Sequence, residues 1–506
     1  MASMLGRRGL LRRVGALGAL GGAAVIAACG GAPPPAPTAA AKPTEAQPAK
    51  PAGPAAAAPT TAPAAAPTTA PAAAAKPTEA PAAAKPAAAP AGPVNITIHF
   101  SAAGRYAEFV GKYTTDVVAK KYPSYKIEVL DSPGHEEVFT KMLSLFAAGR
   151  SGDMGYIYPA QGWLGSFSAK GMFADHDALV KSDNYDLKQF FDGAIKFSRV
   201  DGVLRALPWH AHAEHWTWFL NLNAFQEAGV KPPPLEPPYE WTIDQEVDMG
   251  TKLLKKSGDK VERFGISPKT DYIGLFMIMR AFGGDLLGDD GKQIRLGEKP
   301  SRDAVKWIYD RIYKHKYTPT AAQMEGGDQQ MFIAGKLAVI YGPGSIGPVM
   351  WKSIGDKFKI GVAVGPNGPP PTGQKAAGVG PNCLGLLNSS KNKDQAWQVL
   401  KEHVSQDAGV QKVLFGAGAP GGRPDSYDDP KLLEAFPGVK VVRHQLGFGW
   451  PENLPWNLRG REMTAAVQST LDNVWLNKMT PDEGVDATIK KMEEVLKLSD
   501  VRTDKA

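Results

Sequence analysis

The sequence predicts an α/β fold made of two lobes. From residue 94 onward, predicted strands and helices alternate along the chain, which is the order of a parallel sheet with helices on both faces. The region 94–506 is also larger than one hydrophobic core usually becomes, so it should divide into two. The residues before 94 have a composition that cannot form a core, which confines the folded part to this region.

The first 28 residues have the layout of an export signal. Arg7, Arg8, Arg12 and Arg13 precede an apolar run, 14–28, that is too short to serve as a permanent membrane span. The first two arginines with the following Gly-Leu-Leu resemble a twin-arginine signal, although arginine pairs also occur in general secretory signals. The sequence therefore predicts export and leaves the route open.

The end of this signal resembles a bacterial lipobox. In the stretch Ile-Ala-Ala-Cys, 26–29, the resemblance implies that Cys29 is acylated and becomes the mature N-terminus. We therefore expect a lipid anchor that holds the protein at the outer face of the cell membrane, in the periplasm or at the cell surface. An ordinary signal peptide with a chance cysteine is the alternative.

Residues 29–93 are predicted to be a tether. After Cys29 the segment is almost wholly Ala, Pro and Thr, with APTTAPAA repeated at 58 and 66 and KPTEA at 42 and 76. Without large apolar side chains to offset the entropy of ordering, the segment should stay unfolded and proline-stiffened. At ~3 Å per residue in polyproline II, it would reach on the order of 150–200 Å when fully extended. Glycosylation of its threonines stays open.

Charge and cysteine content limit the function classes. The net charge of +7 comes mostly from the four arginines of the signal and from a surplus of lysine in the tether. The folded region is nearly neutral, so the basic pI is no argument for nucleic-acid binding. With Cys29 used for the anchor, Cys383 has no partner for a disulfide and is expected to be a small core residue.

The first half of the folded region has a βαβαβ order. We predict strands at 94–100, 125–131 and 154–158, separated by helices at 106–121 and 135–148. Such sheets bind ligands in the crevice at the carboxyl ends of their strands. The remaining predicted elements are helices at 241–256, 275–282, 301–315, 393–406 and 461–476 and a strand at 337–341.

Eight segments in fixed order resemble one family, the extracellular solute-binding proteins of bacterial ABC importers, in the branch of sugar and maltodextrin binders. No single segment is specific, but together they cover essentially all of 94–506. The segments are KYPSYKIEV (121–129), KMLSLFAAGRSGDMGYI (141–157), DGVLRALPW (201–209), FLNLNAFQEAGVKPP (219–233), EWT (240–242), FIAGKLAVIYGP (332–343), FKIGVAVGPNGP (358–369) and KNKDQAWQVLKEHVSQDAGVQ (391–411).

The resemblance implies a two-lobed periplasmic-binding-protein fold of type II, with the ligand held between lobes that a multi-segment hinge joins. It places the first crossing after Leu207 and Pro208, the second near 378–386 and a third near 418–424. The expected first lobe covers about 94–208 and 381–418, and the second covers about 209–380 and 419–506. The implied partners are a small solute and the membrane permease of an importer. We expect a monomer without a cofactor.

The stretch 206–225 contains a dense group of rings, ALPWHAHAEHWTWFLNLNAF. If it is extended, His210, His212, Glu214, Trp216 and Trp218 share one face, and Trp209 lies on the other. His210, His212 and Glu214 could bind zinc. However, residues two apart on a strand are roughly 6.5–7 Å apart at Cα, and metal sites usually collect ligands from several segments.

The preferred interpretation is a ligand-binding wall made of aromatic and hydrogen-bonding groups. Sugars have apolar C–H faces that lie against rings, and hydroxyl groups that need donors and acceptors. Trp209, His210, His212 and Glu214, nearest the first crossing, are the predicted ligand residues of this stretch. Trp216, Trp218 and Phe219 are equally well explained as core residues of the second lobe.

Other candidates lie at strand ends and crossings. Ser101 and Tyr106 follow the first predicted strand. Tyr158 and Trp163, which supply two rings, follow the third. The region near 271 matches a part of sugar binders that supplies contacts from the second lobe. Position 341 has tyrosine where similar proteins often have tryptophan, which leaves the ligand class open. These candidates are Ser101, Tyr106, Tyr158, Gln161, Trp163, Asp271, Tyr272, Tyr341, Ser345, Asn382, Arg423, Trp450 and Trp456.

The competing hypothesis from another class is a secreted carbohydrate-active enzyme. Carboxylates are frequent enough for a glycosidase pair, but no nucleophile elbow, phosphate loop or metal-hydrolase motif is present. The number of tryptophans favours a carbohydrate ligand, whereas the few clustered arginines disfavour a strong anion. A polyamine would require more carboxylates than Glu214 and Asp271. Iron sites in related folds usually contain tyrosine instead of histidine.

Overall fold

The computed structural model describes residues 93–498 except 289, 372, 377, 449 and 452–458. Contacts divide the chain into Met1–Lys85 and Pro86–Ala506, and every described residue belongs to the second unit. The export signal, Cys29, the tether and Trp456 lie outside the described residues. Within the described part, no helix is both long and apolar enough to cross a membrane.

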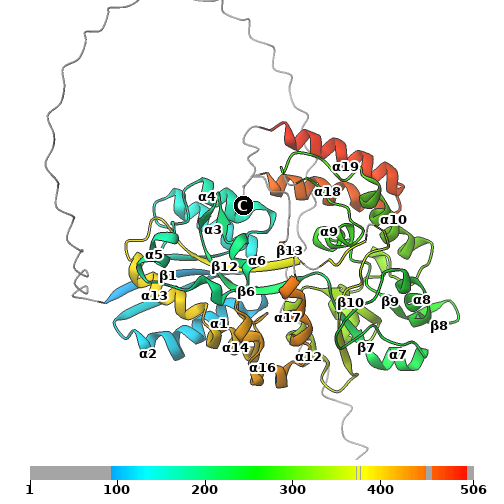
Figure 1. Ribbon diagram of the computed structural model, residues 1–506, viewed down its shortest axis with the longest axis horizontal. Coiled ribbons are helices and arrows are strands. Elements are labelled where there is room, and N and C mark those ends of the chain that lie inside the picture. The colour runs from blue at the N-terminus through cyan, green and yellow to red at the C-terminus, as the bar shows by residue number, and fades with distance from the viewer. Residues whose placement is uncertain are drawn as a thin grey trace, which may run out of the picture. The chain divides into compact units, whose positions relative to one another are not determined.

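The first lobe is built on a mixed sheet with the strand order β13-β12-β3-β1-β2, and β6 pairs with β12 as well (Figure 1). β1 is parallel to β2 and β3, and β12 is antiparallel to β3 and β6. The predicted βαβαβ order is confirmed. The strands are β1 (Val94–Ser101), β2 (Tyr125–Ser132), β3 (Met154–Ile157), β6 (Leu207–Glu214), β12 (Gly378–Leu386) and β13 (Trp450–Pro451).

Helices cover this sheet. The predicted helix 106–121 has a π-helical segment in its middle, η2 (Thr114–Val118), between α1 (Tyr106–Tyr113) and α2 (Ala119–Lys121). A second predicted helix, 393–406, ends early because Ser405 caps the next one. The helices are α3 (His135–Ala147), α4 (Trp163–Ala169), α5 (Asp177–Ser182), α6 (Asp192–Phe197), α13 (Lys393–His403) and α14 (Gln406–Phe415), with short turns η1 (Ala103–Arg105), η3 (Ala160–Gly162) and η4 (Leu187–Gln189) and a small hairpin, β4 (Arg199–Val200) and β5 (Val203–Leu204).

The second lobe has a five-stranded sheet of order β11-β7-β10-β9-β8. β9 and β10 are parallel, so their carboxyl ends lie at the same edge. Its strands are β7 (Thr217–Asn221), β8 (Lys255–Ser257), β9 (Lys260–Ile266), β10 (Leu337–Gly342) and β11 (Ile360–Val364). Its helices are α7 (Leu222–Ala228), α8 (Asp244–Leu253), α9 (Tyr272–Ala281), α10 (Lys299–Tyr313), α11 (Asp328–Ile333), α12 (Gly347–Ile354), α18 (Gly460–Trp475) and α19 (Pro481–Leu496), with turns η5 (Ala321–Gln323) and η6 (Gly344–Ile346).

The carboxyl-terminal end of the helix predicted at 241–256 is wrong. α8 stops at Leu253, and β8 then pairs with β9 as a hairpin around Gly258, which has a φ of +59°. A positive φ is easy for glycine and favours this tight reversal over continued helix.

The chain passes from the first sheet to the second between β6 and β7. Figure 1 shows β6 and β12 in the middle of the unit, between the two groups of elements. His215, at the passage, has a φ of +35°, which is rare for a residue with a side chain. Three helices, α15 (Pro424–Tyr427), α16 (Pro430–Ala435) and α17 (Val439–Phe448), follow the end of α14, and α17 contacts β6 and β11.

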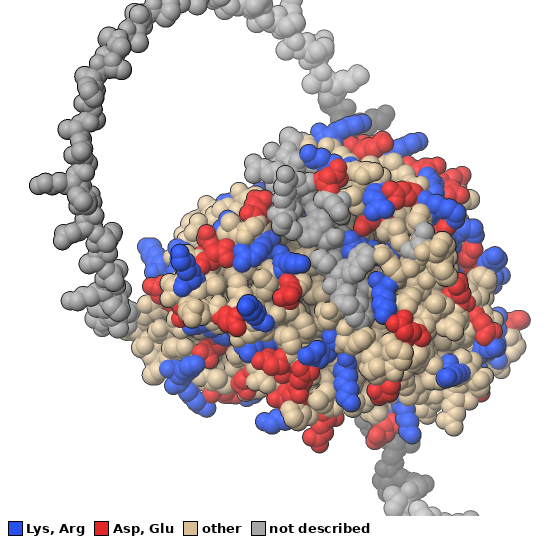
Figure 2. All heavy atoms as spheres, in the orientation of Figure 1, with Lys and Arg blue, Asp and Glu red and all other residues tan. Residues whose placement is uncertain are grey.

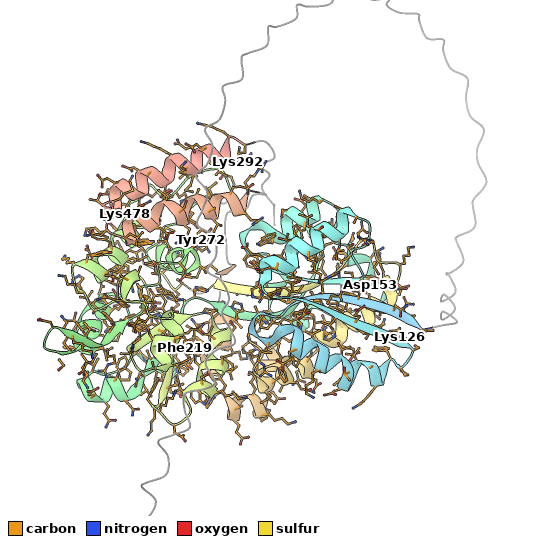
Figure 3. All side chains as sticks on the ribbon, turned by 180° about the vertical axis from the view of Figure 1, so that it is seen from behind. Lys126, Asp153, Phe219, Tyr272, Lys292 and Lys478 are labelled. Carbon is orange, nitrogen blue, oxygen red and sulfur yellow. The ribbon has the colours of Figure 1, made fainter. Side chains whose placement is uncertain are left out.

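Three hydrophobic clusters form the core, one in each lobe and one along the crossing. The crossing cluster joins Ala211 and Ala213 of β6 to Phe219 of β7, which Figure 3 labels. Cys383 is fully buried, with its thiol 3.3 Å from the hydroxyl of Ser198, as expected for a core residue.

Candidate functional site

Aromatic and imidazole rings collect at the carboxyl edge of the first sheet. Tyr106 begins the helix after β1, His135 begins the helix after β2, and Tyr156 and Tyr158 come from the end of β3. The ring of His135 lies 5.7 Å from that of Tyr106, 5.3 Å from that of Tyr156 and 5.9 Å from that of Tyr158. Three loops that are distant in sequence thus form one continuous ring cluster, in which Tyr106 and Tyr156 are buried.

Trp209 and His210, which are both buried, join this ring cluster from β6. Pro208 pairs with Cys383 and His210 pairs with Asn382, so Trp209 is the additional residue of a β-bulge. Both rings contact Tyr106, at 5.0 and 5.5 Å between centroids. The predicted strict alternation, with these two side chains on opposite faces, is therefore wrong, because the bulge redirects one of them.

The histidines of β6 lie in surroundings that favour the neutral imidazole. Nε2 of His210 lies 2.7 Å from the amide nitrogen of Asn382, and the imidazole of His212 is 5.2 Å from that of His210. Burial lowers the pKa of His210 well below its usual value and lowers the pKa of His212 to about 3. If the Asn382 amide donates, Nε2 of His210 accepts and the ring proton lies on Nδ1.

Several buried nitrogens on this edge have no partner among the described residues. They are Nε1 of Trp209 and Nδ1 of both His210 and His135. A buried N–H group without an acceptor costs free energy, so these positions are suited to donate to oxygen atoms of a bound molecule.

The carboxyl edge of the second sheet carries charged groups instead. Asp271 caps α9 by accepting from the backbone of Gly274, lies 3.2 Å from Nδ1 of His215 and lies 3.6 Å from Nζ of Lys269. Nζ of Lys269 is also 3.2 Å from Asp328. Although burial favours the neutral acid, Lys269 and His215 hold the pKa of Asp271 below its usual range.

Two residues of this charged group have strained backbones. Lys269 has a φ of +47° and His215 a φ of +35°, and both side chains reach Asp271. Such strain is concentrated at functional sites in proteins. His215 also contributes to the lowered pKa of His212, so the two edges meet at this segment.

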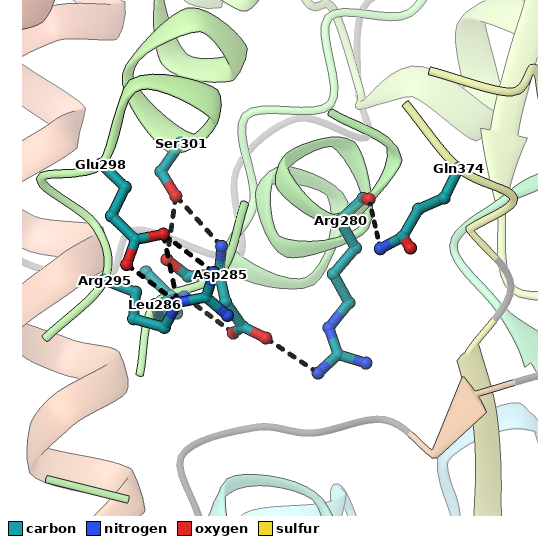
Figure 4. Close-up of polar contacts among 7 residues, drawn as sticks. All are labelled: Arg280, Asp285, Leu286, Arg295, Glu298, Ser301 and Gln374. Atoms are coloured by element: carbon teal, nitrogen blue, oxygen red, sulfur yellow. Dashed lines mark hydrogen bonds and ion pairs between the residues drawn. The ribbon is translucent and has the colours of Figure 1, made fainter. Parts of the chain in front are cut away.

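Helix α9 is fixed behind this edge. Tyr272, at its start, is buried and is labelled in Figure 3. At its other end, Arg280 donates to Asp285 at 3.0 Å, and the amide of Gln374 donates to the carbonyl of Arg280 at 3.1 Å, as Figure 4 shows. Asp271 therefore projects from a helix that is held at both ends.

The bacterial extracellular solute-binding protein family matches residues 103–409. The chain belongs to this family.

Individual relatives are distant. Curated relatives from Brucella abortus and from Brucella suis biovar 1 are 26% identical over 268 residues, which cover 51% of this chain and 60% of each relative. The chain thus matches about three fifths of the length of these relatives.

Solved structures share the fold. The maltose-bound MalE3 of T. maritima has a TM-score of 0.66 and 23% identity, over 79% of this chain and 100% of that one. A substrate-binding protein of Listeria monocytogenes in complex with cycloalternan has a TM-score of 0.66 and 18% identity, over 80% and 99%. UgpB of Mycobacterium tuberculosis, in complex with glycerophosphocholine, has a TM-score of 0.65 and 18% identity, also over 80% and 99%. This solute-binding protein therefore has the two-lobed α/β fold expected from its sequence.

The lobes of the solute-binding protein contact each other at Trp163. The guanidinium of Arg461, in α18, lies 4.0 Å from the centre of this ring and 3.9 Å from a carboxylate oxygen of Glu136. Ala160, close to Trp163, packs against the core of the second lobe. Trp163 is only 3% exposed, with Phe139 4.7 Å from its ring.

Several predicted ligand residues make internal contacts within their own lobe. Tyr341 is fully buried, stacks on Trp218 at 5.1 Å and accepts from Arg311 at 3.0 Å. Arg423 pairs with Asp425, and the fully buried Ser101 accepts from the backbone of Ala103.

Packing also explains the tryptophans after the crossing. Trp216, Trp218 and Phe219 are fully buried, and Trp216 donates to the carbonyl of Pro366. Ser345 is half-buried in η6. For Gln161, Glu214 and Trp450 only the backbone belongs to the described part, in η3, β6 and β13.

The predicted ligand residues did not include Lys269, His215 or Lys412. The first two are brought to Asp271 by the fold, and the third contacts Trp209 from α14. Over the described residues, no three His, Cys, Asp or Glu side chains lie close enough to hold a metal ion. Lysine, arginine and acidic side chains are interspersed on the described surface that Figure 2 shows.

Proposed function

We propose that this protein is an exported lipoprotein that captures a sugar or oligosaccharide between its lobes and delivers it to the permease of an ABC importer. The observation that carries the proposal is the pairing of two chemically different edges at one crossing. Tyr106, Trp209 and His210 form a neutral, buried ring cluster on one side, and Asp271 and Lys269 form a charged group on the other.

A carbohydrate suits both edges. Its C–H faces lie against aromatic rings, and its hydroxyl groups both donate and accept hydrogen bonds. On the first edge, the unpartnered N–H groups of Trp209 and His210 supply donors. On the second, the ionised Asp271 supplies an acceptor, and a hydrogen bond to a charged group is stronger than one between neutral groups.

The ligands of structural neighbours support this class. Maltose and cycloalternan are bound by two of the proteins that share the fold. Glycerophosphocholine is bound by a third, so the same scaffold also accommodates a phosphodiester. We place the lobe boundaries at about 94–208 with 381–418 and at 209–380 with 419–506, with Cys29 as the lipid anchor and 29–93 as the tether.

A thermal-shift screen tests the proposal. The purified chain carrying Cys29→Ser would be tested with maltose, maltotriose, glycerophosphocholine, spermidine and zinc, because a compound that binds only the folded state raises the melting temperature. We expect a sugar to give the largest shift, and His210→Gln to reduce it. A shift with zinc, abolished by His210→Gln or His212→Gln, without any response to sugars would contradict the proposal.

A further inference from the structure

Lys412 is a buried lysine whose amine contacts a predicted ligand residue. It lies in α14 and is 1% exposed. Its Nζ donates to the carbonyl of Trp209 at 2.9 Å and lies 3.7 Å from the centre of the Trp209 ring. No carboxylate among the described residues lies within ion-pair distance of it.

A buried lysine without a charged partner lowers the stability of the fold. Burying an amine that has no charged partner costs free energy, and an apolar residue of similar volume usually serves a core better. Burial lowers the pKa of Lys412 well below its usual value, which reduces this cost without removing it. The lysine therefore requires an explanation other than core packing.

The contacts of Lys412 with Trp209 explain why a lysine is buried here, because Trp209 forms the β-bulge. Trp209 is the additional residue in β6, and a bulge interrupts the regular hydrogen bonding of a strand pair. Lys412 holds both the carbonyl and the ring of this residue. The ring in turn contacts Phe100, Tyr106 and His210, at 4.8, 5.0 and 5.1 Å.

We infer that Lys412 is a positioning residue of the ligand site, which fixes the bulge that turns both Trp209 and His210 toward Tyr106. Without it, β6 could move back and forth between the bulged and the regular register on β12, which opens its hydrogen bonds, and a shift of one residue moves side chains to the opposite face of a strand. The inference rests on the proposed function for its effect on ligand binding, but its structural part can be tested without a ligand.

Lys412→Met tests it, with hydrogen–deuterium exchange of the ligand-free chain as the first measurement. We expect exchange at 207–214 to rise at least tenfold, while the rest of the first lobe and the melting temperature stay as in the wild type or improve. Lys412→Gln keeps a donor for the Trp209 carbonyl and should remain closer to the wild type. Lys401→Met is the matched control, because it removes a lysine that pairs with Asp183 at the surface of α13. It should change neither the exchange at 207–214 nor the melting temperature.

Affinity for maltose is the second measurement. If the wild type binds maltose, Lys412→Met should weaken binding at least tenfold and Lys412→Gln should weaken it less. If the wild type does not bind, the proposed function fails for this sugar, and the exchange data still decide the role of Lys412. Unchanged exchange at 207–214 would overturn the inference, as would exchange raised evenly over the whole first lobe together with a lower melting temperature.

Discussion

At the scale of single residues, Asp271 shows how one carboxylate can serve both the fold and a ligand. It caps α9 and remains 45% exposed, between His215 and Lys269. Asp271→Asn keeps a capping oxygen but removes the charge that pairs with His215 and Lys269, so stability should fall somewhat, and binding is compared where both proteins are folded. We expect the affinity for the sugar found in the thermal-shift screen to fall by about 1.5–3 kcal/mol, the value of a hydrogen bond to a charged group. Calorimetric titration measures it.

An exposed carboxylate provides the control for this substitution. Asp290→Asn alters a surface turn, where the side chain accepts from Lys292 and Gln293, and should leave binding unchanged. An Asp271→Asn variant that binds as tightly as the wild type would exclude Asp271 from the ligand site.

His212 predicts a dependence of stability on pH. Burial lowers its pKa from 6.5 to about 3, so the unfolded chain takes up a proton that the folded chain refuses over this interval. The free energy of unfolding is therefore unaffected by this residue above pH 6.5 and falls as the pH drops toward 3, by at most about 1.4 kcal/mol per pH unit.

Urea denaturation of wild type and His212→Gln between pH 4 and pH 7 checks this prediction. The variant should lose less free energy of unfolding on acidification than the wild type. Identical pH profiles would mean that His212 is protonated equally well in both states.

At the scale of elements, a buried ion pair holds the charged edge of the second lobe. Arg311 of α10 lies 3.2 Å from Glu246 of α8, both side chains being fully buried, and donates to the carbonyl of Pro268 next to Lys269. Arg311→Met would leave Glu246 buried without its partner. We expect the free energy of unfolding to fall by roughly 3–5 kcal/mol.

Chemical denaturation measures this loss, and Lys252→Met in α8 is the control. Lys252 pairs with Asp248 at the surface, and such pairs contribute about 0–1 kcal/mol. If both substitutions cost the same, the buried pair would have no special part in holding the second lobe.

Local pattern was enough to predict several elements but not the way they meet. Strands 94–100 and 125–131 follow from alternation, and the structure has them within one residue. The bulge at Trp209 depends on pairing with Asn382, far away in sequence, so no local pattern signals it. Lys412 lies beyond the helix predicted at 393–406, and its role becomes visible only because α14 places its amine against the Trp209 carbonyl of β6.

The residues of the candidate site could also be predicted only in part. Ring-rich positions such as Tyr106 and His210 can be found from composition and strand ends, since their chemistry is visible in the sequence. The partners of Asp271 could not be predicted, because His215 and Lys269 reach it only through positive φ angles that side-chain-bearing residues rarely adopt.

At the scale of the whole molecule, the contact of Arg461 with Trp163 and Glu136 joins the two lobes without a ligand. The guanidinium covers a ring face that would be exposed when the lobes separate. A partly exposed cation–π contact contributes about 0.5–1 kcal/mol, and a surface ion pair adds little. Arg461→Ala should therefore shift the ligand-free balance toward separated lobes by roughly fivefold, since about 1 kcal/mol corresponds to that ratio.

Spin labels on the two lobes measure this shift. Lys126 of β2 and Lys478 after α18 are both exposed and are labelled in Figure 3, and each can be replaced by cysteine in the Cys29→Ser chain, where Cys383 is buried. Arg302→Ala, which breaks ion pairs to Asp482 and Asp486 within the second lobe, is the matched control. We expect longer distances to gain population in Arg461→Ala and not in the control. Because a ligand must enter before the lobes close on it, the same variant should also take up ligand faster, and an unchanged distance distribution would show that this contact does not hold the lobes together.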